Sequence, residues 1–535
     1  YVQADGLQTI GYDHGDYNVA TNYVKGNNSY TVFAGANYSH VDGTETWNNE
    51  NYQFPQSLFD RESYSKNSYQ NHQEYMQFRY QNQKGKRYWV GKFTLVNLST
   101  PRNASSGFAK ESTETDVFSN IRKKSLSPKI DLNANLPLSK NQTLILGVHG
   151  KYSANSYHRL YQEQPFETMT DEDEKALSFQ LSAIYNYFSQ KHSLSVELFH
   201  YHDVWNADYS GNCELWQHLW KGESLAFFSY NFQASRRLSL KTRIGLDWLQ
   251  YHLHGDNSFS QLSPRINTNV QYQLNKGMLL WSFNFVNSNH GMDVINRAMI
   301  QVNSHMMEKG MPELKKSHDI NTYLYYMGRF NRLSVSAIGQ FRYNHHPVTD
   351  DYYLDEANGK IVKTYSNGGN AQYYSAILAL QYKLCKFANL SGDIRYNHAE
   401  VKTTWSKHNN NLTGNLGLNM FMGDFALKPY LHFGKKSLDE AALVISKTPI
   451  DYGMSCSYSR GNLYVELQAV SPFKKQEKQY WLDLPIYSYS KSIKDQTASQ
   501  YASIKVAYSF DFGRKTQKVE KDVNKNINSS LLRVE

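Results

Sequence analysis

The sequence predicts an all-β protein, a 22-stranded antiparallel transmembrane β-barrel of the bacterial outer membrane. Three observations support this: apolar and polar residues that alternate over strand-length segments, connections that alternate between short and long, and many aromatic residues. In residues 502–512, Ile504 and Val506 lie on one face of a strand, and Lys505 lies on the other. A period of two gives such a strand one apolar and one polar surface. A wall with lipid outside and water inside accommodates both surfaces.

Composition fits a membrane barrel and excludes several other classes. Charged residues make up 20% of the 535 residues and mean hydropathy is −0.66, and no apolar run approaches the ~18 residues that a spanning helix needs. Aromatic residues reach 14%, which suits the girdles at the two lipid boundaries. The net charge of +9 forms no basic stripe, so nucleic acid binding is not predicted. Three scattered cysteines cannot form a disulfide framework.

The alternation predicts 22 strands, each recognised by apolar residues at every second position. Their expected ranges are 1–11, 17–25, 29–41, 73–82, 88–98, 125–138, 142–152, 176–189, 193–203, 223–235, 238–252, 262–274, 278–288, 317–329, 333–345, 371–385, 390–401, 411–422, 425–434, 450–460, 463–471 and 501–512. Short turns and long segments alternate between them. Outer-membrane barrels have short periplasmic turns and long extracellular loops. The predicted extracellular loops therefore include 42–72, 153–175, 289–316, 346–370 and 472–500.

The strand pattern divides the chain into a barrel, residues 1–513, and a basic periplasmic tail, residues 514–535. The tail holds six Lys and Arg against three Asp and Glu. Strands ~4.8 Å apart and tilted ~40° give 22 of them a diameter of roughly 44 Å. A polar lumen of that width would leak, so we expect a plug that is absent from this chain and is supplied by a removed N-terminal segment or by a partner.

Several short segments occur in an order that is typical of one family of barrels. They are the opening hairpins 17–26 and 29–40, the strand start 262–265, the segment 311–318 and the ending 508–513. Together they resemble the barrel domain of TonB-dependent receptors, in the branch found in Bacteroidota. The segment 311–318 is similar to the family's proline–x–leucine–lysine–proline–glutamate motif, but has Lys316 where the second proline is usual.

The resemblance implies energy-coupled import of a scarce nutrient, such as a siderophore, haem, a metal complex, a peptide or a glycan. A plug would block the barrel, an external ligand would bind the loops, and TonB would pull on the plug from the periplasm. Outer-membrane lipid and lipopolysaccharide, and a surface lipoprotein, are the other expected partners, and no cofactor is expected. The alternative is a structural or accessory barrel of an outer-membrane complex that does not transport.

The loop at 289–316 is the first candidate for a ligand site. It carries His290, His305, Met306 and Met307 among further methionines. Imidazole and thioether ligands together suit copper or haem iron, although the spacing fits no fixed coordination pattern and leaves the metal undefined. The alternative is that these methionines fill gaps where the loop folds over the lumen.

The segment 204–221 is the second candidate. It carries Trp216 and Trp220, whose rings could bind sugars or ring-bearing ligands, or else belong to the membrane girdle. The acidic run 171–174 is expected to be a solvated loop tip. The sequence contains no H-E-x-x-H, G-x-S-x-G or phosphate-binding glycine loop, so we predict no catalytic site and no enzyme activity. Five charged residues are predicted to face the lumen: Lys241, Arg243, Asp247, Arg342 and Arg395.

Overall fold

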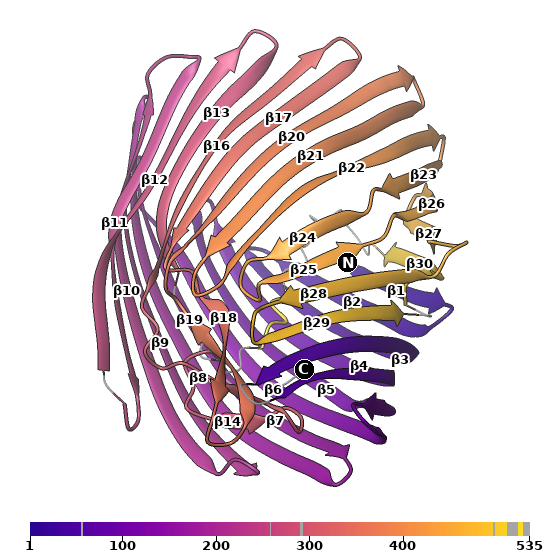
Figure 1. Cartoon of the computed structure of the whole chain (residues 1–535). Coiled ribbons are helices and arrows are strands. Elements are labelled where there is room, and N and C mark those ends of the chain that lie inside the picture. The colour runs from indigo at the N-terminus through magenta and orange to yellow at the C-terminus, as the bar shows by residue number, and fades with distance from the viewer. Residues whose placement is uncertain (55–56, 257, 289–292, 496–497, 511–522, 528–535) are drawn as a thin grey trace.

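The computed structural model describes residues 1–54, 57–256, 258–288, 293–495, 498–510 and 523–527. Within these residues, 22 antiparallel strands pair in sequence order and close into one barrel (Figure 1). The wall strands are β1 (Val2–Ile10), β2 (Asp13–Lys25), β3 (Asn28–Phe54), β4 (Ser57–Lys84), β5 (Arg87–Lys110), β6 (Glu114–Ser139), β7 (Gln142–Glu163), β8 (Phe166–Phe188), β9 (His192–Gly211), β10 (Leu215–Gln233), β11 (Leu238–Leu253), β12 (Ser258–Leu274), β13 (Gly277–Ser288), β16 (Ser317–Phe330), β17 (Leu333–His345), β20 (Asn370–Cys385), β21 (Ala388–Lys402), β22 (Ser406–Met422), β23 (Phe425–His432), β26 (Asp451–Arg460), β27 (Leu463–Val470) and β30 (Tyr501–Phe510).

Closure is made by the first and last wall strands. β1 pairs with β30 over nine residues, with Gly6 opposite Val506, and β30 pairs on its other side with β27. Closed pairing leaves no strand edge exposed to lipid, which a membrane wall requires. The predicted fold is therefore confirmed. In the described parts of the chain, no helix has the length and apolarity needed to cross a membrane.

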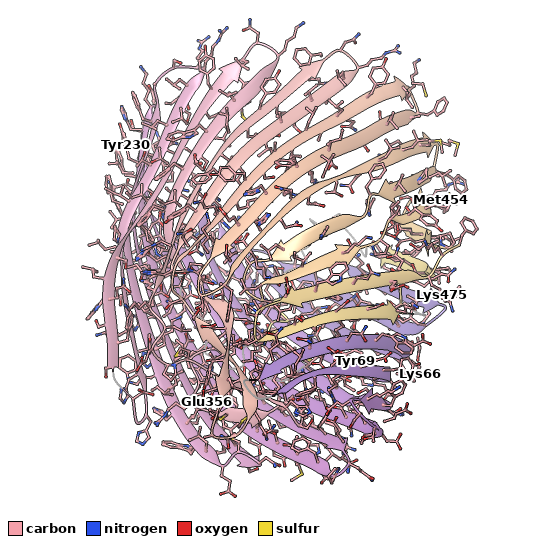
Figure 2. The ribbon with its side chains drawn as sticks, viewed as in Figure 1. Lys66, Tyr69, Tyr230, Glu356, Met454 and Lys475 are labelled. Carbon is pink, nitrogen blue, oxygen red and sulfur yellow. The ribbon has the colours of Figure 1, made fainter. Side chains whose placement is uncertain are left out.

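The two faces of the wall differ as the alternation predicts, and Figure 2 shows side chains projecting from both. Exposed apolar side chains form a continuous outer surface, here called the belt. It includes Val19, Met76, Leu95, Ile130, Leu181, Leu198, Ile244, Leu246, Ile266, Leu324, Leu378, Ile394, Leu416, Leu467, Ile504 and Val506. An apolar belt on a closed polar-lined barrel is the architecture of a protein that spans the bacterial outer membrane.

Several predicted extracellular loops are strands instead. Residues 42–72 belong mostly to β3 and β4, which are 27 and 28 residues long, and 153–175 belong mostly to β7 and β8. The segment 204–221 lies in β9 and β10 around a short turn at 212–214. Above the membrane both faces of a strand meet water, so the apolar half of the alternation disappears and the sequence resembles a polar loop. The wall therefore extends well beyond the belt on the extracellular side.

Four further strands build the upper wall. They are β24 (Lys435–Asp439), β25 (Val444–Thr448), β28 (Gln476–Asp483) and β29 (Tyr487–Asp495). β25 pairs with β28, and β29 pairs with the upper part of β3, with Ser492 opposite Trp47. The β28–β29 hairpin thus fills the wall above the short strands β1 and β2, in the segment where a loop at 472–500 was predicted.

A second sheet, here called the loop sheet, forms from the connections after β13 and after β17. Its strands are β14 (Met299–Gln301), β15 (Met306–Lys309), β18 (Thr349–Asp355) and β19 (Lys360–Ser366). β15 and β19 pair in parallel, with Met307 opposite Val362, and this joins the connection after β13 to the connection after β17. Figure 1 shows β14, β18 and β19 in front of the extracellular ends of the wall strands. The loop sheet therefore lies at the extracellular mouth.

The described part of the predicted tail lies inside the barrel. Val523 and Ile527 pack against Phe33 and Tyr75, two buried residues that alternate along β3 and β4 with the outward-facing side chains of the belt. Residues 523–527 of the predicted tail therefore lie in the lumen, against the inner wall. The physical reason is that two apolar residues spaced four apart in a polar segment find apolar partners on the inner wall, which they lack in water.

Candidate functional site at the extracellular mouth

An apolar cluster fixes the loop sheet to the upper wall. Met306, Tyr352 and Ile361 of the loop sheet pack with Tyr52 of β3 and Leu482 of β28, and all five side chains are buried. Burial of large apolar side chains contributes roughly 1.5–3 kcal/mol each. The loop sheet is therefore a packed part of the mouth.

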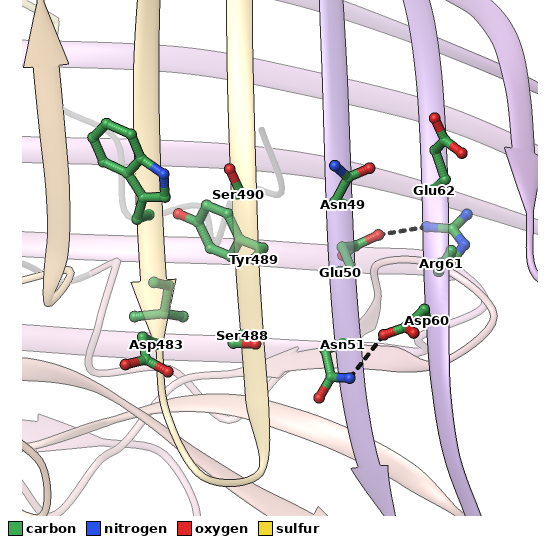
Figure 3. A pocket seen from close by; sticks show the side chains of 12 residues that line it. Asn49, Glu50, Asn51, Asp60, Arg61, Glu62, Asp483, Ser488, Tyr489 and Ser490 are labelled. Atoms are coloured by element: carbon green, nitrogen blue, oxygen red, sulfur yellow. Dashed lines mark hydrogen bonds and ion pairs between the residues drawn. The ribbon is translucent and has the colours of Figure 1, made fainter.

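A buried ion-pair network lies beside this cluster, and its centre is Arg61. The guanidinium lies 2.8 Å from Glu50 Oε2 and 2.9 Å from Glu163 Oε1, and the three side chains are at most 9% exposed. It also donates to the Tyr161 hydroxyl at 3.2 Å. The Tyr487 hydroxyl donates to Glu50 at 2.7 Å. The network therefore joins β3, β4 and β7 to the hairpin that carries β29; Figure 3 shows the link between Glu50 and Arg61.

In this network, burial and the charges of neighbouring residues shift the pKa values of Glu163 and Arg61 in opposite directions. Burial raises the pKa of Glu163, but the charge and hydrogen bonds of Arg61 outweigh it and hold that pKa below its ordinary value of 4.5. Burial also opposes the charge of Arg61, while Glu50 and the other acids raise its pKa above the ordinary value of 12.5. Glu163 and Arg61 are therefore both ionised at neutral pH.

His305 connects the loop sheet to this network. Its Nε2 atom lies 2.6 Å from Glu111 Oε1, and Arg61 Nε lies 3.7 Å from the same carboxylate oxygen. The imidazole also contacts the ring of Phe59 at a centroid distance of 4.7 Å. The neighbouring Ser304 hydroxyl donates to Glu163 at 3.1 Å. The turn before β15 is thus held on the wall by polar contacts at two consecutive residues.

A second charged group lies within the loop sheet. Lys363 Nζ lies 3.2 Å from Glu308 Oε1 and 3.4 Å from Asp350 Oδ2, and the Tyr365 hydroxyl donates to the same Glu308 oxygen. Burial raises the pKa of Asp350 to about 6, and Glu308 adds to this effect, while Lys363 opposes it. One cation therefore faces two carboxylates at the mouth.

The raised pKa of Asp350 gives a prediction on pH dependence. Because the folded-state pKa lies above the ordinary value of 3.8, the folded protein binds more protons between these values, and the Asp350 contribution to stability falls as the pH rises to about 6. Asp350→Asn should therefore raise the melting temperature at pH 7.5 more than at pH 4. Thermal unfolding at both values, with the exposed Glu356→Gln as control, measures this. An equal change at both values would contradict it.

The structure separates the residues predicted to bind ligand. Met306 is 7% exposed inside the apolar cluster, Met307 is half-buried in β15, and His305 faces Glu111. His290 lies outside the described residues. Trp216 is 50% exposed and faces outward.

The two tryptophans belong to a band of rings on the outside of β9, β10 and β11. Trp220 stacks on His202, and Trp216 stacks on His218 and meets His254 edge-on. The inner face of β10 carries Gln217 and Leu219, and both are buried beneath the connection at 293–298. Trp216 and Trp220 therefore lie on the opposite side of the wall from the loop sheet.

The charged residues predicted for the lumen have different partners. Arg243 lies 2.6 Å from Glu197 and over the ring of Phe227. Arg342 reaches Glu440 in the connection between β24 and β25. Arg395 lies 2.6 Å from Asp393 on its own strand, and Lys241 is exposed.

Asp247 lies in a buried cluster of charged side chains whose association was not predicted from the sequence. Its carboxylate lies 2.8 Å from Lys316 Nζ and 2.5 Å from an Arg265 nitrogen, and Arg265 also reaches Glu223 at 3.1 Å. The side chains of Lys316 and Asp247 are fully buried. Lys316, which stands where the resemblance led us to expect proline, thus anchors the connection before β16 to the wall. In the sequence, two features could have indicated this pair: Asp247 on the predicted lumen face, and Lys316 in place of the usual proline.

The acidic run 171–174 is not a solvated loop tip. Glu172 and Glu174 are each 1% exposed on the inner face of β8, and Asp171 and Asp173 lie on the outer face. Asp171 lies 2.5 Å from His158 on the neighbouring strand. Strand alternation therefore divides the run between two environments.

The described residues form no candidate metal centre, but they line a pocket at the mouth. No group of three or more His, Cys, Asp or Glu side chains in the described ranges could hold a metal ion. A pocket of about 520 Å³ lies between the β28–β29 hairpin and the upper parts of β3 and β4, lined by Glu50, Arg61, Asp483, Tyr489 and their neighbours (Figure 3). The pocket at the mouth is therefore lined by charged and aromatic side chains on packed strands.

Comparison with known proteins supports the fold through structure alone. No protein-family model matches the chain, and no curated protein matches its sequence. The copper transporter OprC has a similar solved structure, with a TM-score of 0.66 at 10% identity over 95% of this chain and 80% of that one. The ferric-catecholate import receptor Fiu from K12 E. coli has 0.62 at 10% identity, over 95% and 81%. The FrpB iron transporter from Neisseria meningitidis has 0.60 at 8% identity, over 95% and 81%. These likenesses show a shared barrel fold.

Proposed function

We propose that this chain is the barrel of an energy-coupled outer-membrane receptor that imports a scarce nutrient, working with a plug domain and TonB. The observation that carries the proposal is the closed, polar-lined barrel of 22 strands whose extracellular mouth holds a packed loop sheet. Outer-membrane barrels of this size are typically transporters whose lumen is plugged. The similar structures are, by their names, carriers or receptors for copper, iron and ferric catecholate.

The imported ligand is proposed to be a small metal complex that contacts the connection 289–316. Support comes from its His and Met content and from its place at the mouth, where His305 and Met307 lie in or beside β15. Trp216 and Trp220 face outward, so we assign them to contact with lipopolysaccharide sugars outside the barrel. A surface lipoprotein that covers the mouth is a further proposed partner.

Growth of a deletion strain tests the proposed function directly. The complete gene is deleted from the source bacterium, and growth is measured with iron, haem, copper, peptide, glycan or vitamin supplied from a single limiting source. We expect slow growth on one source, restored by the intact gene. Normal growth on every source, with loss of another outer-membrane protein from its complex, would instead support the accessory barrel.

Exchanging the candidate ligand residues tests the site. His290→Ala and His305→Ala, combined with Met306→Leu and Met307→Leu, should abolish binding of the growth-limiting nutrient to the full-length protein while the barrel keeps its heat stability. Ligand binding is measured by isothermal titration, and barrel folding by heat-modifiable mobility. A matched control replaces the outward pair by Trp216→Phe and Trp220→Phe. Binding that survives the fourfold exchange would show that the methionines only pack.

A further inference from the structure

The inner wall carries an apolar patch at the depth of the belt, here called the wall patch. It consists of Ala20, Phe33, Tyr75 and Val96 on the adjacent strands β2, β3, β4 and β5, and each is at most 9% exposed. The registers bring the four together, since Phe33 pairs with Ala20 and Tyr75 pairs with Val96. A water-filled lumen gives no reason for four neighbouring inward side chains to be apolar, so this patch is suited to a partner.

The chain's own C-terminal segment covers the wall patch. Val523 and Ile527 pack on it, and Lys525 Nζ lies 4.2 Å above the centre of the Tyr75 ring. Lys129, 6% exposed in β6, donates from Nζ to the carbonyl oxygens of Asn524 and Asn526 at 2.7 and 2.6 Å. Apolar contacts, a cation–π contact and two charged hydrogen bonds thus act over five residues.

Negative charge on the wall also favours docking of this segment, which carries Lys525. The Tyr75 hydroxyl donates to Asn18, whose amide contacts Asp5 and Asp16 at 3.1 Å each. The carboxylates therefore lie close to the ring on which Lys525 is placed. A cation above Tyr75 faces both the negative face of the ring and nearby negative charge.

We propose that residues 523–527 are a tethered occupant of the lumen, which docks on the wall patch and narrows the pore. This use of the C-terminal segment is independent of the imported nutrient and of coupling to TonB. A peptide held on the inner wall at the depth of the belt reduces the cross-section available to ions. Release of the segment would widen the lumen without any change in the wall.

Photo-crosslinking locates the segment in cells. The amino acid p-benzoylphenylalanine replaces Lys525 in the complete gene, and Leu58, 67% exposed at the extracellular end of β4, carries the same probe as control. We expect irradiation to join position 525 to peptides that contain Phe33 or Tyr75, and the control to give no such product. Products with a plug or with a periplasmic protein in place of the wall would overturn the proposal.

Two pairs of substitutions separate docking from folding. Val523→Asp with Ile527→Asp should abolish the crosslink and increase single-channel conductance of the purified chain in planar bilayers. Val523→Ile with Ile527→Val should leave both unchanged. Heat-modifiable mobility confirms that each barrel is folded, because the four substitutions lie outside the wall strands. Unchanged crosslinking and conductance in the folded aspartate variant would overturn the proposal.

Discussion

Replacing Arg61 by Met is expected to open the extracellular mouth while the membrane part of the barrel stays folded. The substitution leaves Glu50 and Glu163 buried without their cation, since the three side chains are at most 9% exposed. Removing one partner of a buried pair costs about 3–5 kcal/mol. Hydrogen exchange followed by mass spectrometry should therefore show a loss of protection in the upper parts of β3, β4 and β7.

The matched control for this prediction is Arg87→Met, which removes an exposed arginine at the periplasmic start of β5. Its effect on exchange at the mouth should be small, because exposed charges contribute little to stability.

Low pH should cause the same loss of protection at the mouth as Arg61→Met. The lowered pKa of Glu163 adds stability above the ordinary value of 4.5, and this stability is lost as the pH falls through the folded-state pKa. Wild-type protection at the mouth after Arg61→Met would show that the network does not hold it.

Replacing Val506 by Arg is expected to destabilise the barrel in lipid. Val506 is 41% exposed on the outer face of β30. It pairs with Gly6 of β1, where the barrel closes. An arginine on the lipid face near the middle of the bilayer costs about 2–4 kcal/mol. Reversible unfolding by guanidinium from phospholipid vesicles measures this change in the free energy of unfolding.

Ala507→Arg provides the same new side chain on the opposite face. Ala507 pairs with Asp5 across the closure, on the side of the wall that carries Lys505 and Ser503. An arginine there projects into the polar lumen, so we expect a change of less than about 1 kcal/mol. Equal losses for Val506→Arg and Ala507→Arg would contradict the assignment of lipid and lumen faces.

The transmembrane part was predictable because lipid imposes a pattern on the sequence. Every second residue must be apolar where the wall meets lipid, and residues such as Leu246 and Ile504 record this directly. Above the belt that constraint ends, which explains why the upper half of β3 was predicted to be a loop. The β28–β29 hairpin was missed for the same reason.

The mouth was less predictable because its contacts join distant segments. Arg61 meets Glu163 from 102 residues away, and Met306 meets Ile361 through a parallel pairing that no local pattern encodes. The histidine and methionine content of 289–316 did point to the connection that reaches the mouth. It could not show that Met306 would pack in an apolar cluster or that His305 would face Glu111.

Uptake of the limiting nutrient, once the growth screen has identified it, tests the central claim most directly. Uptake of the radiolabelled nutrient is measured in cells that carry the complete gene, with and without a protonophore. The protonophore abolishes the energy that TonB transmits. Our account predicts uptake that depends on the gene and stops when the protonophore is added, while binding at the cell surface continues. Uptake that proceeds at the same rate without energy, or without the gene, would contradict it.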